Sequence, residues 1–309
     1  MLCCAANVIE DRVLQAATMD PEALPSNWIE VAEHPAFGAA ARRFAANILA
    51  VAEADRKLAA VFKDAGHYFT AMSAAYLDAR GGLTFTVLRQ VCAGSGLLTA
   101  NRAGALIDYM LHVGVLEAAP ANGCRITAAF QAAWCRHLQA ALEAATMLEP
   151  ALAPLLDALA DQAVYQRFIG LQADRLYALA RAPDLFPGLR ASFLHPLAGC
   201  SILHTLSLAC TDADFAPLDG ATVSLARLSQ RFTVSQPHVR RLLKRAEANR
   251  FLLHLGPSRR AFHPAGFATI RYHYAAHLAE LIACGRQMLE SDENADPVEH
   301  RAVRAVAAA

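Results

Sequence analysis

The sequence predicts a mainly α-helical protein with two winged helix-turn-helix units, each carrying a short β-hairpin wing, and long helices that pair the units. Three observations lead to this prediction. Amphipathic segments rich in Ala and Leu occupy most of the chain. Strand-like runs are few and short. A segment of the second half repeats the pattern of one in the first half, 136 residues earlier.

Hydrophobic spacing sets the expected elements. Helices are predicted over about 36–64, 66–79, 127–147, 150–181, 190–210 and 264–290. Short strands are predicted at 115–117, 125–127, 251–255 and 261–263. The chain has 309 residues, of which 55% are hydrophobic, so it is too apolar to be disordered and long enough for about two domains.

The breaks between these segments predict five regions. A helical or flexible N-terminal segment covers 1–35, and a first winged-helix unit with its flanking helices covers 36–148. A central helical region follows at 149–220. The second winged-helix unit and the helix after it cover 221–290, and a flexible tail without hydrophobic period covers 291–309.

The repeat is clearest between 99–116 and 235–252, which align without a gap. Each segment opens on a small hydroxylated residue, Thr99 or Ser235, which suits the N-cap of a helix. The matching apolar pairs are Leu106-Ile107 and Leu242-Leu243. A short strand, a turn with Gly, an Arg and another helix follow in both halves, so the chain consists of two related halves.

A helix-turn-helix is predicted at the start of the second unit. Ser224 suits the N-cap of a first helix over 225–232, and Thr233-Val234 suits the turn. Ser235 then caps the second helix, with Pro237 in its first turn, where the missing N–H is not needed. The apolar face of this helix consists of Val239, Leu242, Leu243 and Ala246.

The opposite face of the second helix predicts contacts to duplex DNA. Cations suit phosphates, and planar donors near the helix N-terminus suit base edges in the major groove. Base readout is assigned to Gln236, His238 and Arg241, phosphate contacts to Arg240, Lys244 and Arg245, and Ser235 joins the interface at the helix start. A hairpin follows, with Arg259 and Arg260 expected at its tip, where they suit a minor groove or the flanking phosphates.

The charge pattern distinguishes this face from an ordinary solvated one. The whole chain has a formal net charge of zero, but 221–275 holds ten basic residues and one acid, Glu247. A solvated helix face normally mixes signs at i,i+4. Arg241 and Arg245 are instead a like-charge pair, which costs helix stability, and an anionic partner explains why the sequence keeps it.

Residues 222–280 resemble the winged-helix domain of the MarR family of bacterial transcription regulators. The likeness lies in the helix-turn-helix, in the Arg259-Arg260 hairpin and in FHPAGFATI at 262–270. This last run is similar to the family's segment that follows the wing and opens a long dimerisation helix, and RITAAFQAAW at 125–134 resembles it less closely. The resemblance implies a regulator that acts as a dimer and responds to a small-molecule effector.

The first unit keeps this framework but loses its charges. Gly104, Ala105, Asp108 and Tyr109 stand where the second unit has Arg240, Arg241, Lys244 and Arg245. Arg102, at the place of His238, is the one basic residue left on that face. Each lost phosphate contact weakens binding and flattens its salt dependence, so we expect the first unit to read DNA poorly.

Two arrangements of the units remain open. In one, the two halves form a single-chain pseudo-dimer with one active and one silent reader. In the other, helices over 36–79, 127–181 and 264–290 pair two chains, and the homodimer supplies two readers. Isologous dimers that read palindromes are the common solution, which favours the second arrangement.

Other classes of function find less support in the sequence. No phosphate-binding loop, dinucleotide fingerprint or nucleophile elbow occurs, so we expect no enzyme, no catalytic residue and no cofactor. The pairs His273/His277 and Cys200/His204 have the spacing of zinc ligands, but core or interface roles are expected and no metal. The alternatives to a transcription regulator are a winged-helix protein-interaction module and a tandem winged-helix replication initiator.

The sequence also bears on location. The start MLCCAANVIEDR lacks the basic region of a secretory signal. The most apolar stretch, 193–210, is broken by His195, Pro196 and His204, so a buried helix is expected there and no membrane span. The eight cysteines form no Cys-x-x-Cys motif and are expected to be reduced. We therefore expect a cytoplasmic protein, associated with the nucleoid through its DNA contacts.

Overall fold

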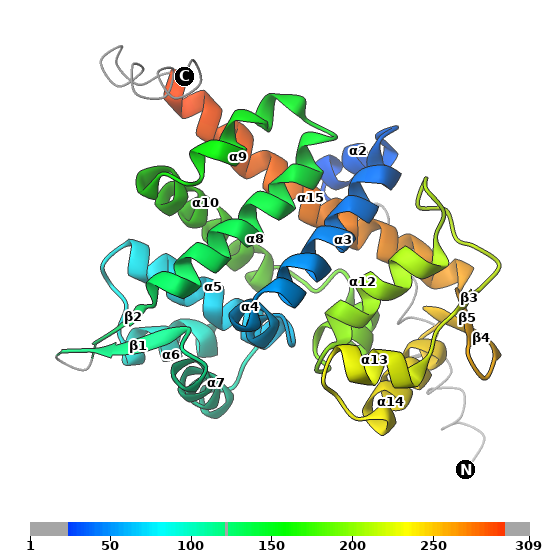
Figure 1. Cartoon of the computed structure of the whole chain (residues 1–309). Coiled ribbons are helices and arrows are strands. Elements are labelled where there is room, and N and C mark those ends of the chain that lie inside the picture. The colour runs from blue at the N-terminus through cyan, green and yellow to red at the C-terminus, as the bar shows by residue number, and fades with distance from the viewer. Residues whose placement is uncertain (1–23, 121–122, 294–309) are drawn as a thin grey trace.

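The computed structural model describes residues 24–120 and 123–293 (Figure 1). This part of the chain is mainly helical and has two small antiparallel sheets, which confirms the predicted fold class. Most of the predicted N-terminal segment 1–35 and of the predicted tail 291–309 lies outside the described residues.

The elements follow one another in two series. The first half contains α2 (Ser26–Glu33), α3 (Phe37–Ala54), α4 (Arg56–Val61), α5 (Ala65–Ala79), α6 (Phe85–Gly94), α7 (Ala100–His112), β1 (Leu116–Ala119), β2 (Gly123–Ile126) and α8 (Ala128–Thr146). The second half starts with η2 (Pro150–Leu152), α9 (Pro154–Ala158), α10 (Gln162–Arg181), α11 (Pro187–Leu189), η3 (Arg190–Leu194) and α12 (Gly199–Cys210). It ends with β3 (Ala221–Thr222), α13 (Leu225–Arg231), α14 (Gln236–Ala248), β4 (Leu252–Gly256), β5 (Arg259–Phe262) and α15 (Pro264–Glu293).

Three of the predicted long helices are interrupted by local features. Within 36–64, Asp55 has extended backbone, and its carboxylate accepts hydrogen bonds from the N–H groups that begin α4. Asp161 caps α10 in the same way within 150–181. In 190–210, Ala198 has a left-handed backbone with φ +59° between η3 and α12. Hydrophobic spacing continues across these breaks and therefore does not reveal them.

The structure confirms the internal repeat and extends it. The helix α7 and the strand β2 correspond residue for residue to α14 and β5, 136 residues later, and α8 begins where α15 does. The buried residues of α7 are Ala103, Leu106, Ile107 and Met110, and those of α14 are Val239, Leu242, Leu243 and Ala246. These are the same four helix positions, so both units bury the same face of this helix.

Caps and turns are repeated as well. Thr99 and Ser235 each accept a hydrogen bond from the backbone N–H three residues later, which caps α7 and α14. At the turn after each helix, Gly114 and Arg250 both have positive φ, +69° and +56°. An arginine is an uncommon residue in this conformation. The backbone of the unit is thus retained even where the side chain no longer favours it.

Each unit carries a small antiparallel wing. In the first, β1 pairs with β2, and Thr84 forms a single bridge to Gly123. In the second, the strand order is β3-β5-β4, with Leu252 opposite Phe262 and an irregular register near the hairpin end. The wing of the second unit is therefore the more complete of the two.

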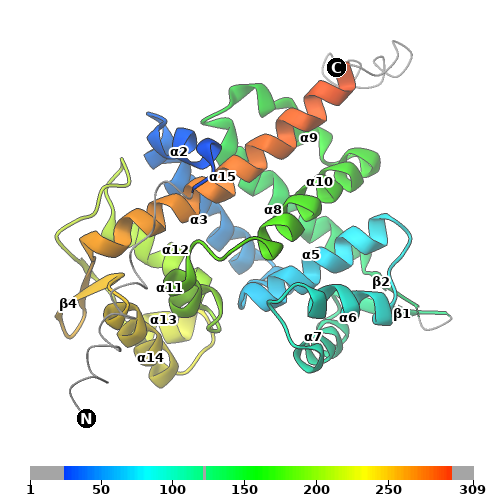
Figure 2. The same cartoon turned by 180° about the vertical axis from the view of Figure 1, so that it is seen from behind.

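The long helices lie at the centre of the molecule and join the two halves (Figure 2). The helix α8 packs on α15. The helix α3 packs on α8 and on α12 of the second half, while α10 packs on α15 and on α5 of the first half. Helices that the sequence analysis assigned to the pairing of two chains thus pack within one chain, around a continuous apolar core.

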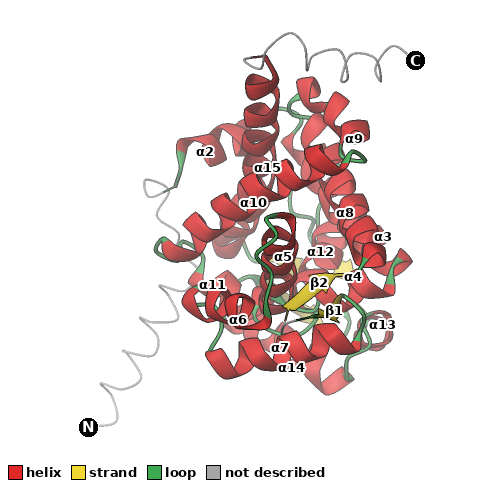
Figure 3. Ribbon diagram, turned by 90° about the vertical axis from the view of Figure 1, so that its left-hand side faces the viewer, coloured by secondary structure: helices red, strands yellow, loops and turns green. Residues whose placement is uncertain are grey.

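Both helix-turn-helix units face the same side of the molecule. The helices α7 and α14 lie along the lower edge of Figure 1, one in each half, and again at the lower edge of Figure 3, which is turned by 90°. The C-terminal end of α15 lies at the opposite edge in both views. One surface therefore presents both units.

No single helix among the described residues is long and apolar enough to cross a bilayer. The helical pair Pro187–Leu194 and Gly199–Cys210 meets the length and composition of a span only when taken together, and it is bent by 100°. The helix α12 is instead packed into the core, where Ile202, Leu203 and Leu206 are fully buried.

The six cysteines within the described ranges are free thiols, as predicted. Burial is the main cause that raises the pKa of Cys200 and of Cys284 to about 12. These thiols are therefore protonated at neutral pH, which makes them poor nucleophiles.

Besides His67, three histidines are buried inside the described part of the protein. His137, His204 and His273 are 4%, 3% and 4% exposed. Burial lowers the pKa of His137 and His204 to about 3 and that of His273 well below its ordinary value, and the neighbouring His277 lowers all three further. His137 and His273 occupy the same position of the repeat, on α8 and α15.

We predict that the free energy of unfolding falls as the pH drops below 6.5. The unfolded chain then protonates these three histidines near their ordinary pKa of 6.5. The native state keeps His137 and His204 neutral down to a pH of about 3, and burial holds the pKa of His273 well below 6.5. Each histidine costs about 1.4 kcal/mol per pH unit in this window. Urea unfolding between about pH 7.5 and about pH 5.5 measures the loss.

Two variants identify the source of this pH dependence. His273→Gln should reduce the slope of the unfolding free energy against pH, because one buried imidazole is gone. The matched change of an exposed histidine, His112→Gln, should leave it unchanged. A wild-type unfolding free energy that stays constant over this pH range would contradict the burial of neutral imidazoles.

Candidate nucleic-acid interface

The exposed face of α14 carries a group of cations that no acid within 24–120 or 123–293 neutralises. Arg240, Arg241 and Lys244 are exposed, and Gln236 lies one turn before Arg240 on the same face. Among the described residues, none forms an ion pair or a side-chain hydrogen bond with these three cations. The guanidinium and ammonium groups are therefore available to an external anion.

The local sequence holds this face outward. Ser235 Oγ accepts a hydrogen bond of 3.3 Å from the backbone N–H of His238, and Pro237 occupies the first turn of α14. Val239 and Leu243 are buried on the opposite side, against the core of the second unit. Because the apolar face is fixed by packing, the cationic face has only one direction in which to point.

Two of the predicted DNA contacts are held by the chain itself. His238 Nε2 lies 2.8 Å from the backbone oxygen of Leu197. Arg245 donates a hydrogen bond of 3.2 Å to the backbone oxygen of Ala191. Both acceptors belong to the segment 190–198, which lies against α14. His238 and Arg245 thus help to position α14, whereas the sequence predicts that they contact bases and phosphates.

The prediction that Arg260 contacts DNA is wrong. Arg260 lies in β5 and is 6% exposed. Its Nε lies 2.7 Å from Oε1 of Glu247, and its guanidinium donates to the backbone oxygens of Gly256 and Arg259 at 2.9 Å. Side chains alternate between the two faces of a strand, so the exposed Arg259 points outward and its neighbour points inward.

This ion pair has a consequence for the whole basic block. Glu247 is the one acid within 221–275, and its carboxylate is engaged by the buried Arg260, with His254 Nδ1 at 3.4 Å. It is therefore not available to the cations of the exposed face of α14. The block keeps its unbalanced positive charge on the outside.

Two exposed arginines were not among the predicted DNA contacts. Arg227 lies in the first turn of α13, and Arg250 lies at the turn between α14 and β4. Helix-turn-helix proteins place the first helix across the phosphate backbone, so Arg227 is in a position to contact phosphates. Both belong to the ten basic residues of 221–275, but no periodic pattern in the sequence distinguishes them from the other eight.

The equivalent face of α7 differs in charge. Ala105 and Asp108 are exposed there. Arg102 is not a free cation, because it lies 2.8 Å from Asp64, which is 3% exposed. Burial raises the pKa of Asp64, but the hydrogen bond and charge of His67 and the charge of Arg102 together hold it below its ordinary value. The α7 face therefore offers no unpaired cation among these residues.

The histidine and cysteine pairs considered as zinc ligands take part in packing. His273 and His277 rings lie with centroids 4.6 Å apart, and His277 stacks on Phe44. Cys200 Sγ lies 3.5 Å from His204 Nε2. Over 24–120 and 123–293, no group of three or more His, Cys, Asp or Glu side chains is arranged to hold a metal ion.

Comparisons with family models, with curated proteins and with solved structures find no match for this chain. The resemblance to the MarR family therefore stays a prediction. What the chain does has to be inferred from its own geometry and charge.

We predict that the two wing arginines differ in their effect on stability. Arg260→Ala removes one partner of a buried ion pair and should lower the free energy of unfolding by about 2–3 kcal/mol, a little below the range for fully buried pairs because Glu247 is partly exposed. Arg259→Ala should change it by about 0.5 kcal/mol or less. Urea unfolding of both variants measures this, and equal effects would contradict the inward placement of Arg260.

Proposed function

We propose that the protein is a DNA-binding transcription regulator whose second winged-helix unit contacts duplex DNA. The observation that carries this proposal is the exposed, unpaired group Arg240, Arg241 and Lys244, beside a single acid that is already engaged by Arg260. Such a one-signed surface costs free energy unless an anion neutralises it. DNA is the polyanion that a winged helix-turn-helix fits.

The geometry supports a specific mode of docking. The α14 helix enters the major groove, with Gln236 and Arg241 nearest to the base edges. Arg240 and Lys244 contact the phosphates on either side, and Arg259 on the wing reaches the backbone or the adjacent minor groove. Base contacts supply sequence preference, while phosphate contacts supply most of the affinity.

We further propose that a single chain acts as a pseudo-dimer with one active reader. Two findings support this: the pairing helices pack within the chain, and both helix-turn-helix units face one side. The DNA then meets Gly104, Ala105 and Asp108 of the first unit, which attract no phosphate. One chain would thus recognise one half-site without a palindrome, at the nucleoid in the cytoplasm. The homodimer remains the alternative, with two chains supplying two readers.

The other two functions are separated from this one by what the protein binds. A winged-helix interaction module would bind a protein and no DNA. A replication initiator would read DNA with the same helix but occupy one origin instead of promoters. Genome-wide crosslinking distinguishes promoters from an origin, and the next variant distinguishes DNA readers from an interaction module.

We predict that Arg241→Ala/Lys244→Ala weakens binding to genomic DNA fragments about a hundredfold or more, because a base contact and a phosphate contact are lost. Fluorescence anisotropy measures the affinity. The control is Arg43→Ala/Arg136→Ala, which removes the same charge from exposed positions on α3 and α8. If the first double variant binds as well as wild type, or if both bind equally weakly, α14 is not the reader.

We also predict that a second reader can be restored. Gly104→Arg/Ala105→Arg/Asp108→Lys places cations on the α7 face, where a Cβ at Gly104 meets nothing closer than 3.9 Å. The DNA footprint should lengthen by about one helical turn, roughly 10 base pairs. Ala151→Arg/Ala153→Arg/Asp157→Lys adds the same charge at exposed positions near α9 and should not lengthen it. An unchanged footprint in the α7 variant would contradict the shared DNA-facing side.

A further inference from the structure

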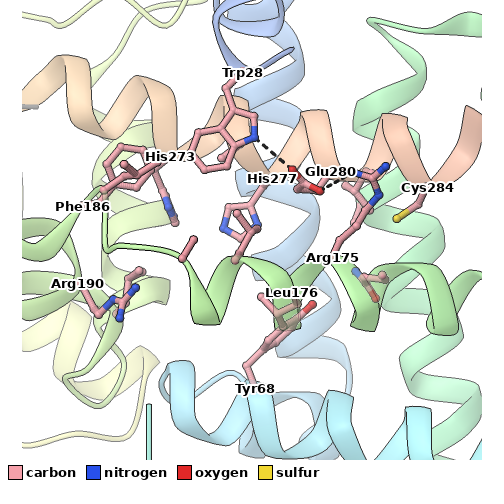
Figure 4. A pocket seen from close by; sticks show the side chains of 18 of the residues that line it. Trp28, Tyr68, Arg175, Leu176, Phe186, Arg190, His273, His277, Glu280 and Cys284 are labelled. Carbon is pink, nitrogen blue, oxygen red and sulfur yellow. Dashed lines mark hydrogen bonds and ion pairs between the residues drawn. The ribbon is translucent and has the colours of Figure 1, made fainter. Parts of the chain in front are cut away.

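A cavity of about 240 Å³ lies between the two halves (Figure 4). Its wall includes Phe44, Tyr68 and His137 from the first half and residues of α10 and α15 from the second. The exposed residues 182–184 form part of its border, so the cavity opens to the surface there. Neither the DNA-facing residues nor the wings take part in it.

The wall is mostly aromatic and aliphatic. Trp28, Tyr68, Leu176 and Phe186 surround the space shown in Figure 4. The Phe44 ring, which also lines the cavity, stacks on His277 with centroids 5.5 Å apart. Trp28 and Phe186 stack with ring centroids 5.9 Å apart. Such a lining favours a planar apolar molecule, because ring burial removes a large apolar area from water.

Imidazole groups supply the polarity of the cavity. The exposed side chain of His277 lines the cavity. It forms no hydrogen bond with any described residue. Two further lining residues, His137 and His273, each have one buried ring nitrogen without a hydrogen-bond partner among the described residues. The side-chain oxygen of Gln172, another lining residue, is likewise buried without a partner there. Unpartnered buried polar atoms cost free energy, and a small rotation of these side chains toward the cavity would let a bound polar group pair with them.

Charged groups at the cavity already have partners. Arg175 donates a hydrogen bond of 3.0 Å to Oε2 of Glu280. The other carboxylate oxygen of Glu280, Oε1, accepts a hydrogen bond of 3.2 Å from the indole N–H of Trp28. Arg190 lies 3.1 Å from Asp184. An ionic molecule entering here would lose its hydration without gaining a counter-charge, which is unfavourable. The wall therefore selects against charged molecules.

We infer that this cavity binds a small uncharged molecule with one or two fused rings and a hydroxyl group, and that the hydroxyl pairs with His277. A hydroxyl both donates and accepts, so it matches either tautomer of the imidazole. Ring stacking and burial supply most of the affinity, and the hydroxyl supplies the selection.

The cavity wall is continuous with the segment that holds α14. Phe186, Arg190 and Leu194 line the cavity, and the next residues contact the reader helix. These contacts are Ala191 with Arg245, Ser192 with Asn249 and Leu197 with His238. A bound molecule that moves this segment therefore changes the position of α14. This coupling rests on the proposed DNA-reading function, whereas binding in the cavity does not.

Three probes of one shape test the binding. 2-Naphthol has the ring system and the hydroxyl, 2-methoxynaphthalene has no donor, and 2-naphthoate is charged. In calorimetric titrations of the full chain we expect 2-naphthol to bind, the methyl ether to bind about tenfold more weakly, and the naphthoate to bind more weakly still. No binding of 2-naphthol up to about 1 mM, or equal binding of all three, would overturn the inference.

Variants locate the site. His277→Phe keeps the ring and removes the polar atoms, so the preference for 2-naphthol over its ether should disappear. Leu176→Trp fills the cavity and should reduce 2-naphthol binding more than tenfold, whereas Ala178→Trp, exposed on the same helix, should leave it unchanged. Unaltered binding in Leu176→Trp would place the probe elsewhere and overturn the assignment.

The coupling has a separate readout. Saturating 2-naphthol should change the affinity of the chain for its DNA at least about threefold, and Leu176→Trp should abolish that change. Calorimetric binding together with an unaltered DNA affinity overturns the coupling alone. A chain that binds 2-naphthol but no DNA contradicts the proposed function and leaves the cavity assignment supported, so the two failures are distinguishable.

Discussion

The packing of α8 against α15 is the contact on which the remaining structure depends. Each is the long helix that follows the wing of one unit, and each has an apolar surface that its own unit cannot cover. Their contact, reinforced by α3 and α10 from opposite halves, buries these surfaces in one core. This contact also places both helix-turn-helix units on one side of the molecule. The cationic face of α14 and the uncharged or acidic residues of α7 therefore lie at two ends of one surface.

The two units share one backbone plan but differ in their exposed side chains. The backbone of the unit is retained down to its caps and turns, including the positive φ of Arg250 at the place of Gly114. The exposed side chains have diverged, because the packing of the unit does not depend on them. The cavity shares this asymmetry: His137 and His273 are equivalent, but His277 stands where the first half has Ala141.

Periodic and local features could be predicted from the sequence. The repeat offset, the Ser224 and Ser235 caps and the α14 faces follow from spacing and from residue types at helix ends. The inward turn of Arg260 could have been found by applying strand alternation to the wing. The support of His238 and Arg245 by 190–198 could not be predicted. It joins residues 41 and 54 positions apart through backbone oxygens, which no pattern of side chains encodes. The cavity depends on tertiary packing in the same way.

The most direct test of the claim that one unit contacts DNA is the salt dependence of the affinity of the wild-type chain for a bound genomic fragment. Each phosphate contact adds about 0.9 to the slope of log K against log salt concentration. Contacts from Arg227, Arg240, Lys244, Arg250 and Arg259 predict a slope of about −4.5 with one chain per site. A slope near zero would exclude DNA as the partner, and a slope of about −9 would mean that two units read it.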